Sequence, residues 1–146
     1  MDQLEELTYS ECRALLAGGV LGRIALCTPK GARLLPVNYS VVGEAVIFRT
    51  SADGVIAASD WELPMAFEVD HVDYNELTGW SVVAAGCGER VEDPGMLDRI
   101  KRTWDPRPWA SGDRPLYVRI PWSDLTGRRL GPGSTRENDL PGRWLL

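Results

Sequence analysis

The first apolar pattern along the chain predicts a helix from Thr8 to Gly19. Thr8 and Glu11 have the spacing of a capping box, in which each side chain bonds the backbone of the other residue. Leu7 and Cys12 stand where a hydrophobic staple would fix the helix start. Glycines at the end of the pattern favour termination there. An amphipathic helix is therefore expected ahead of the rest of the fold.

Most of the remaining chain consists of short apolar runs separated by turn-forming residues, which is typical of strands. The expected strands cover residues 22–28, 34–42, 45–50, 65–70, 79–92 and 116–121, with a further short strand over 125–130. Pro36 favours an edge or a bulge in its strand. Gly86 and Gly88 favour a bulge or bend in the longest one.

Strands outnumber helices, and most are joined by short turns. A short helix is expected over 53–59, and Asp93-Pro94 has the form of a cap followed by proline at the first helical position. The pattern favours a mainly β fold with flanking helices, a closed or nearly closed antiparallel barrel. The length of 146 residues fits one domain over 1–146, with a core at about 7–130 and a tail at 131–146 rich in Gly, Pro and charge.

Charge and hydropathy narrow the classes of partner. The net charge of −5 argues against nucleic acid as a partner, because phosphate-backbone binding relies on basic patches. No run of about 18 apolar residues is present, so we expect no membrane partner. The polar, acidic start at Met1–Glu6 lacks the regions of a secretion signal, and we expect a cytoplasmic protein.

Cysteine and histidine usage argues against a metal centre. Cys12, Cys27 and Cys87 are odd in number and lack metal-ligand spacing, so three free, buried thiols are expected. His71 is the single histidine and lies in a charged stretch, where an exposed position without a catalytic role is expected. We therefore expect no bound metal.

Familiar catalytic motifs are missing from the sequence, which has no phosphate-binding glycine loop, nucleophile elbow or helical zinc motif. Glu68 and Asp70 lie two residues apart on an expected strand and therefore share one face. They are either paired catalytic carboxylates or the polar side of a half-buried strand. The second interpretation is favoured, since nothing else in the sequence supports a catalytic pair.

Two other segments contain candidate ligand-binding groups. Phe48-Arg49-Thr50-Ser51 ends an apolar strand with a guanidinium and two hydroxyls, which can hold a phosphate. The alternative, a surface arginine followed by a turn, is favoured by spacing alone. Trp80 begins the longest strand, where an indole can pack beside a planar ring, fill a dimer interface or join the core.

Several segments, in their shared order and spacing, resemble the pyridoxamine 5′-phosphate oxidase-like family of flavin-binding split β-barrels. These segments are Glu11-Cys12, Leu15-Leu16, Gly22-Arg23-Ile24-Ala25, Pro36-Val37-Asn38-Tyr39, Phe48-Arg49-Thr50, Phe67-Glu68-Val69-Asp70, Gly79-Trp80-Ser81-Val82 and Thr126-Gly127-Arg128-Arg129-Leu130. The resemblance covers about Leu7 to Leu130 and is nearest to the small uncharacterised members of the family.

The resemblance implies a six-stranded antiparallel split β-barrel that forms a homodimer with two flavin sites at its interface. The implied function is that of an FMN-binding oxidoreductase acting on an unidentified small molecule. The implied cofactor-binding residues are Pro36, Val37, Asn38 and Tyr39 along the isoalloxazine ring, Arg49, Thr50 and Ser51 at the phosphate with the adjoining Phe48, and Trp80, Ser81 and Val82 from the strand near the interface.

One position departs from the family pattern. Members commonly carry a phosphate-binding lysine shortly after the Arg-Thr pair, and here Val55 occupies that position. There is also no counterpart of the arginine-histidine cluster that grips the substrate in true pyridoxamine phosphate oxidases, so vitamin B6 oxidation is not expected. Two alternatives remain: a non-catalytic flavin or small-ligand binding module with a degenerate phosphate site, and a deazaflavin (F420)-dependent reductase.

Overall fold

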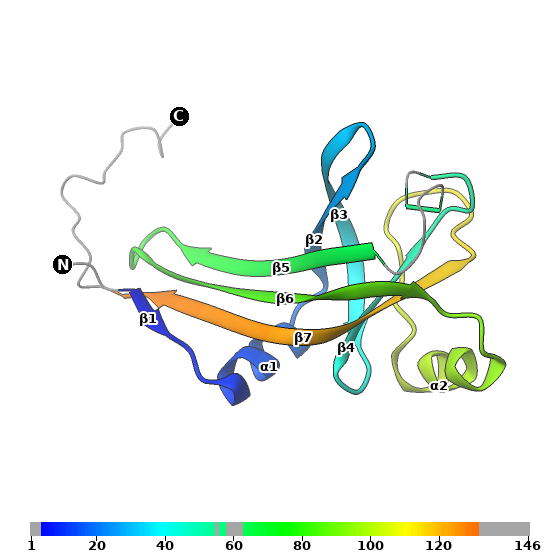
Figure 1. Ribbon diagram of the computed structural model, residues 1–146. Coiled ribbons are helices and arrows are strands. Elements are labelled where there is room, and N and C mark those ends of the chain that lie inside the picture. Colours follow the sequence, from blue (N-terminus) through cyan, green and yellow to red (C-terminus); the bar gives the residue numbers. More distant parts are fainter. Residues whose placement is uncertain (1–3, 55, 58–62, 132–146) are drawn as a thin grey trace.

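Antiparallel strands form one continuous sheet in the computed structural model, which describes residues 4–54, 56–57 and 63–131 (Figure 1). The elements in these ranges are β1 (Leu4–Glu6), α1 (Tyr9–Ala17), β2 (Leu21–Thr28), β3 (Gly31–Val41), β4 (Ala45–Thr50), β5 (Leu63–Asp73), β6 (Thr78–Arg90), α2 (Pro94–Trp104) and β7 (Leu116–Leu130). The two helices lie toward opposite ends of the sheet (Figure 1).

The sheet closes on itself. Its strand order is β1-β7-β4-β3-β2-β5-β6, and β6 also pairs with β7, so strands β2 to β7 form a ring. Closure removes the exposed edges that an open sheet would present. The prediction of a mainly β, six-stranded antiparallel barrel with flanking helices is therefore confirmed, with β1 added outside the ring as a seventh strand.

Two strand predictions differ from the structure. Residues 116–121 and 125–130 were expected as separate strands, whereas β7 runs unbroken through Pro121, which pairs with Ala45 at the end of β4. β1 was not expected, because Leu4–Glu6 is short and acidic. It pairs with the last residues of β7, where Glu5 and Glu6 stand opposite Arg129 and Arg128.

Local helix signals are confirmed by the backbone geometry. The Glu11 amide donates to Thr8 Oγ1 at 3.2 Å, and the Thr8 amide donates to Glu11 Oε1 at 2.8 Å, which completes the capping box. The bond from the Thr8 amide is the main cause that holds the pKa of the Glu11 carboxyl below its ordinary value. Asp93 caps α2, with Pro94 in the first turn. The expected short helix at 53–59 is not seen: its described residues lie in turns, and Val55 and 58–59 lie outside the described part.

The core has an inner and an outer part. The inner part fills the barrel and includes Leu16 of α1, Phe48 of β4 and Phe67 of β5. The outer part lies between the barrel wall and α2 and contains Val42, Ala45, Ile47, Val91, Ile100 and Tyr117. Because side chains alternate along a strand, β4 is buried on both faces.

Two backbone irregularities were predicted from single residues. The register between β6 and β7 shifts at Ala85/Gly86, which confirms the bulge expected there. A Cβ at Gly86 would run into the carbonyl oxygen of Pro121, so the close approach requires glycine. Pro36 lies in the part of β3 that pairs with β2 alone, since β4 pairs only with Tyr39–Val41. The edge position is therefore also confirmed.

The cysteine prediction is partly wrong. All three thiols are free and Cys12 is buried, but Cys27 and Cys87 are exposed. Alternate side chains of β2 point to solvent, and Cys27 occupies one of these outward-facing positions. His71 is exposed, as predicted. In the described part of the chain no helix is long and apolar enough to cross a bilayer, and no three His, Cys, Asp or Glu side chains cluster as metal ligands.

Candidate functional site

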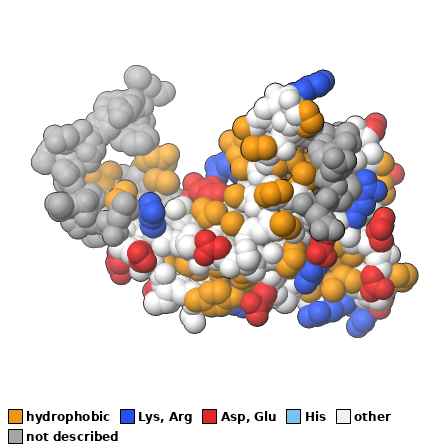
Figure 2. Space-filling view, in the orientation of Figure 1, with side chains coloured by type: hydrophobic (Ala, Val, Ile, Leu, Met, Phe, Trp, Pro, Cys, Tyr) orange, Lys and Arg blue, Asp and Glu red, His pale blue; other side chains and the backbone are white. Residues whose placement is uncertain are grey.

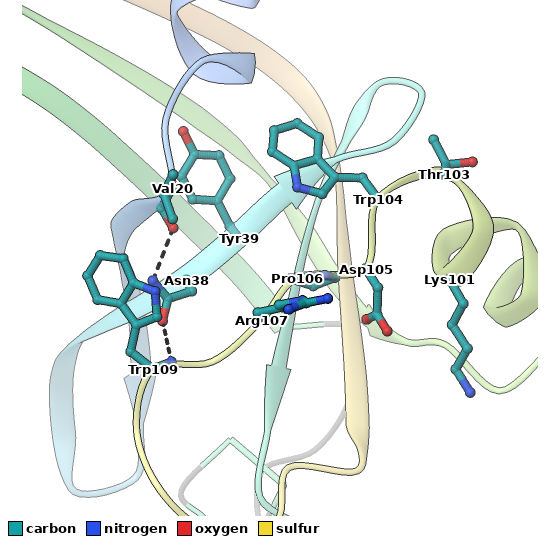
Figure 3. A pocket seen from close by; sticks show the side chains of 10 residues that line it. All are labelled: Val20, Asn38, Tyr39, Lys101, Thr103, Trp104, Asp105, Pro106, Arg107 and Trp109. Carbon is teal, nitrogen blue, oxygen red and sulfur yellow. Dashed lines mark hydrogen bonds between the residues drawn. The ribbon is translucent and has the colours of Figure 1, made fainter.

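A cavity of about 630 Å³ opens between β3 and the segment that begins in the last turn of α2 (Figure 3). Its size falls in the range of small-molecule sites, about 300–1,000 Å³. The lining residues are Val20, Asn38, Tyr39, Lys101, Thr103, Trp104, Asp105, Pro106, Arg107 and Trp109. Asn38 and Tyr39 belong to the stretch expected along a flavin ring, so the structure brings part of the predicted site to a cavity.

The segment over residues 104–109 is held against β3 by hydrogen bonds at both ends. Ser40 Oγ, the buried hydroxyl of β3, donates to the Trp104 carbonyl at 2.8 Å. The Trp109 amide donates to Asn38 Oδ1 at 2.8 Å, and Asn38 Nδ2 donates to the Val20 carbonyl at 3.3 Å (Figure 3). Pro106, between them, is fully buried. The wall of the cavity is therefore preformed.

Tyr39 forms the inner wall. Its ring lies 4.5 Å from that of Phe67, centroid to centroid, and its hydroxyl donates to the Leu16 carbonyl. Burial raises the pKa of Tyr39 to about 12. The hydroxyl is thus kept neutral and already paired, and the side chain is only 2% exposed, so Tyr39 supports the cavity wall from the core and offers no acid–base chemistry.

Arg49 lies on the outer, α2-facing side of β4, behind the cavity wall. Its Nε donates to the Arg114 carbonyl at 3.1 Å, and its Nη1 lies 3.8 Å from Oδ1 of Asp105, which lines the cavity. The guanidinium carbon is 4.9 Å from the centroid of the Tyr117 ring. The ammonium nitrogen of Lys101 is 5.7 Å from the same centroid. Two cations therefore flank one aromatic ring beside the cavity.

Asp105 carries the opposing charge in this group. Tyr117 donates its hydroxyl proton to Asp105 Oδ1 at 2.8 Å. Burial, with this hydrogen bond as a second cause, raises the pKa of Tyr117 to about 12. Since Asp105 already pairs with Tyr117 and Arg49, its negative charge is largely offset within the site. Lys101 and Arg107 leave the lining with a net positive balance.

The other residues predicted for the flavin site on β3 and β4 do not line the cavity. Thr50 points to the opposite face of β4 from Arg49, and its hydroxyl and that of Ser51 lie toward Gly54. Phe48 is fully buried inside the barrel. Pro36 is exposed and Val37 half-buried, and neither lines the cavity. Val55 lies outside the described residues.

Trp80 lines a second, smaller hollow of about 380 Å³. This hollow lies between the end of α1 and strands β5 and β6, and it shares Val20 with the larger cavity. The rings of Trp80 and His71 are 6.3 Å apart there. Ser81 is half-buried, and Val82 is in the core. Within one chain, Trp80 thus lines a different hollow from Asn38 and Tyr39.

Glu68 and Asp70 share one face of β5, as the strand period requires. Arg23 Nη1 lies 2.9 Å from Glu68 Oε1 and 3.5 Å from Asp70 Oδ1. Burial, together with the neighbouring Asp70, raises the pKa of Glu68 despite Arg23. The charge of the Asp70 carboxylate, followed by the hydrogen bond and charge of Glu68, raises the pKa of Arg23. The arrangement is an ion-pair cluster on the polar face of the strand, the interpretation favoured from the sequence.

The residues of the 101–109 segment were missed by sequence reasoning. Lys101, Trp104, Arg107 and Trp109 surround the cavity, yet only the alternation of tryptophan, arginine and proline over 104–109 marks them in the sequence. That alternation alone predicts no site, because the segment reaches the cavity only through the hydrogen bonds that Ser40 and Asn38 make with its backbone.

The strands form a closed barrel, and beside it lies a cavity with an aromatic and basic lining. The pyridoxamine 5′-phosphate oxidase family matches residues 8–129, and the chain belongs to this family. The uncharacterised protein Rv0080 of Mycobacterium tuberculosis is 31% identical over 133 residues, covering 88% of this chain and 86% of that protein.

Solved structures agree with the assignment. An FAD-binding protein from Mycobacterium smegmatis is 28% identical with a TM-score of 0.73, covering 86% of this chain and 98% of that one. A candidate pyridoxamine 5′-phosphate oxidase from Corynebacterium glutamicum is 25% identical with a TM-score of 0.76, covering 88% and 99%. The fold and the family predicted from the sequence are thereby confirmed.

Proposed function

We propose that this chain binds a flavin nucleotide in the cavity beside β3 and acts as a flavin-dependent oxidoreductase. The observation that carries the proposal is the cavity itself, which combines the preformed β3 wall at Asn38, the exposed indoles of Trp104 and Trp109 and a net positive lining. A flavin nucleotide has the matching features, a large planar ring and an anionic phosphate. The similarity to an FAD-binding protein supports the same conclusion.

The groups available to a phosphate lie around Tyr117. Arg49 and Lys101 flank its ring, and Lys101 also lines the cavity. Charge-assisted bonds from such cations are the strong contacts of phosphate sites. Because Val55 replaces the lysine usual in the family, we infer that Lys101, contributed by α2, supplies the second cation. Arg49 and Lys101 therefore fit the phosphate of the proposed cofactor.

The remaining residues would bind and orient the ring. When bound, a flavin supplies the hydride and electron transfer, so the protein need not supply a catalytic acid or base. Asn38 and Tyr39 are held by hydrogen bonds to Val20 and Leu16, which makes the β3 wall rigid. A rigid wall of this kind positions a ring and excludes water from one side of it.

We propose a homodimer with the flavin at its interface. Trp80 faces a hollow separate from the β3 cavity, so its participation in a flavin site requires a second copy of the chain. Hydrophobic side chains gather over the hairpin of β2 and β3 (Figure 2), where Leu34 is 66% exposed. Dimerisation would bury this exposed apolar surface, and obligate interfaces are rich in buried apolar area. Light scattering should return twice the 16.2 kDa mass of the chain; a monomer would contradict the proposal.

A second candidate function is binding of a flavin or another small ligand without turnover. The observation in its favour is the carboxylate of Asp105, which lies 3.8 Å from Arg49 and offsets its charge. Weak phosphate binding would make the flavin exchangeable rather than resident. A deazaflavin-dependent reductase would use the same ring-binding surface of the cavity, but its cofactor would carry a different phosphate-bearing tail.

The absorbance spectrum of freshly purified protein tests the proposal. We expect a yellow protein, or a colourless one that takes up FMN or FAD in equilibrium titration. Uptake of F420 in place of both would favour the deazaflavin reductase. Binding of flavin that cannot be chemically reduced and reoxidised in place would favour the non-catalytic module. No uptake of any flavin would contradict the proposed function.

A further inference from the structure

We propose that the two copies of this chain hold each other by inserting Trp109 of each protomer into the hollow beside Trp80 of its partner. The inference rests on the proposed homodimer and extends it, because it names the contact that joins the copies. Two features of one chain carry it. One is a fixed indole that projects from the surface, and the other is an apolar hollow that the same chain leaves unfilled.

Trp109 is a large apolar side chain on a backbone that is held in place. It is 70% exposed, the highest value among the large hydrophobic residues of the described part of the chain. Its amide donates to Asn38 Oδ1 at 2.8 Å, and Asn38 Nδ2 donates to the Val20 carbonyl at 3.3 Å. Removing an indole from water is strongly favourable. A surface that covers Trp109 would therefore gain stabilisation without having to order its backbone first.

The hollow beside Trp80 has the lining of an interface pocket. It has a volume of about 380 Å³ and lies between the end of α1 and strands β5 and β6. Its apolar lining residues are Ala14, Leu15, Val20, Leu21, Val69 and Trp80. Asp70 is the one carboxylate in the lining, and Arg23 Nη1 pairs with it at 3.5 Å. Interface cores are poor in charge, and aromatic side chains seated in pockets supply much of their binding energy.

The indole and the hollow are neighbours on the surface of one chain. Val20 lines both the hollow and the flavin cavity, and Trp109 lies beside Val20 at one end of that cavity (Figure 3). Trp109 does not line the hollow of its own chain. A twofold axis close to Val20 would exchange the two features, so that each indole enters the other copy's hollow. Such reciprocal pairing is what a twofold interface between identical chains requires.

Two further observations agree with an axis at this place. Val20 and Leu21 are 50% and 46% exposed, and they would meet their own copies near the axis. Trp109 also lines the flavin cavity, so the partner's α1 end would close the cavity at the Trp109 end. Lys101 lies at the opposite end of the lining in Figure 3, which leaves the proposed phosphate group outside the contact.

The test is light scattering on protein without flavin. Wild type should have twice the 16.2 kDa mass of the chain, whereas Trp109→Glu and Ala14→Trp should each have the mass of one chain. Ala14→Trp fills the hollow from an exposed position on α1. An equimolar mixture of the two variants should return to the dimer mass, because one intact indole then meets one intact hollow. A merely structural role of either residue would not produce this rescue.

Matched variants separate the contact from general surface effects. Trp109→Ala should raise the dimer dissociation constant about a hundredfold or more, since an aromatic anchor is lost from both contacts. Trp109→Phe, which keeps an aromatic ring, should remain dimeric. Leu77→Glu is the control, because Leu77 is an exposed apolar residue that lines neither the hollow nor the cavity.

The outcomes distinguish this inference from the proposals on which it rests. A dimeric Trp109→Glu, or a mixture of the two variants that stays monomeric, would overturn the pairing of Trp109 with the hollow and leave the homodimer to another surface. A monomeric wild type would contradict the homodimer and the inference with it. Since every mass is measured without flavin, failure to bind flavin would contradict the proposed function alone.

Discussion

Nη1 of Arg49 lies 3.8 Å from Oδ1 of Asp105, and the same carboxylate oxygen accepts a hydrogen bond from Tyr117. The best-placed cation of the proposed phosphate site is therefore already paired within the chain. A phosphate must compete with Asp105 for this guanidinium. The affinity of the site for an anion is set by that competition as much as by the number of cations.

Asp105→Asn should therefore tighten FMN binding. The amide keeps an oxygen that can accept the Tyr117 hydroxyl, but it no longer offsets the charge of Arg49. Partly exposed ion pairs contribute about 0.2–1 kcal/mol, so an increase of up to about fivefold is expected. Fluorescence titration checks this, with riboflavin, which has no phosphate, as the insensitive control. Weaker FMN binding would mean that Asp105 itself supports the ligand.

Lys101→Ala should weaken FMN binding about tenfold, because Lys101 is inferred to replace the cation missing at position 55. Riboflavin affinity should not change. Lys30→Ala is the matched control, since Lys30 is an exposed lysine in the turn between β2 and β3, away from the cavity lining. Equal FMN affinity in wild type and Lys101→Ala would leave the phosphate to Arg49 alone.

Alkaline pH should destabilise the protein through Tyr39 and Tyr117. Burial raises the pKa of each to about 12 from an ordinary value of 10. Between these values the unfolded chain loses protons that the folded chain keeps, so the stability present below pH 10 is lost as pH rises toward 12.

The check is urea unfolding from neutral pH to above pH 10 for wild type and Tyr39→Phe. The variant should be less stable by about 1 kcal/mol at neutral pH, because it loses the hydrogen bond to the Leu16 carbonyl. Its loss of stability at alkaline pH should nevertheless be shallower than that of the wild type. Parallel profiles would show that Tyr39 titrates normally in the folded chain.

Gly86→Ala should destabilise the barrel by about 2 kcal/mol or more, because a Cβ there would run into the carbonyl oxygen of Pro121 in the facing strand. Gly18→Ala is the control: its added Cβ would lie 3.6 Å from the nearest neighbouring atom, and Gly18 has a negative φ of −87°. Chemical unfolding should separate the two variants clearly. Similar midpoints for both would contradict the close approach at the bulge.

Features that depend on a few neighbouring residues could be predicted from the sequence. The capping box needs only Thr8 and Glu11, and the bulge needs only Gly86 at a close approach of two strands. Pro36 marks an edge because it has no amide proton to donate. These signals, with the order of the strand segments, were sufficient for the barrel and its family.

Features that depend on distant partners could not be predicted. β1 forms because Leu4–Glu6 pairs with the last residues of β7, Arg128 to Leu130, which lie more than a hundred positions away in the sequence. The 104–109 segment joins the site because Ser40 and Asn38 bond its backbone. Arg49 and Thr50 were predicted as one group, yet adjacent strand residues point to opposite faces, and only the position of α2 shows which face adjoins the cavity.

The most direct test of flavin binding at the β3 cavity is an equilibrium titration of wild type and Arg49→Ala with FMN and riboflavin. We predict that wild type binds FMN, that Arg49→Ala weakens this binding by about 2 kcal/mol, roughly thirty-fold, and that riboflavin affinity stays the same in both proteins. That pattern would locate the phosphate at Arg49, at the edge of the cavity wall, and the ring in the cavity itself. Tight binding of FMN that is unaffected by Arg49→Ala, or no binding of either ligand to wild type, would contradict the account.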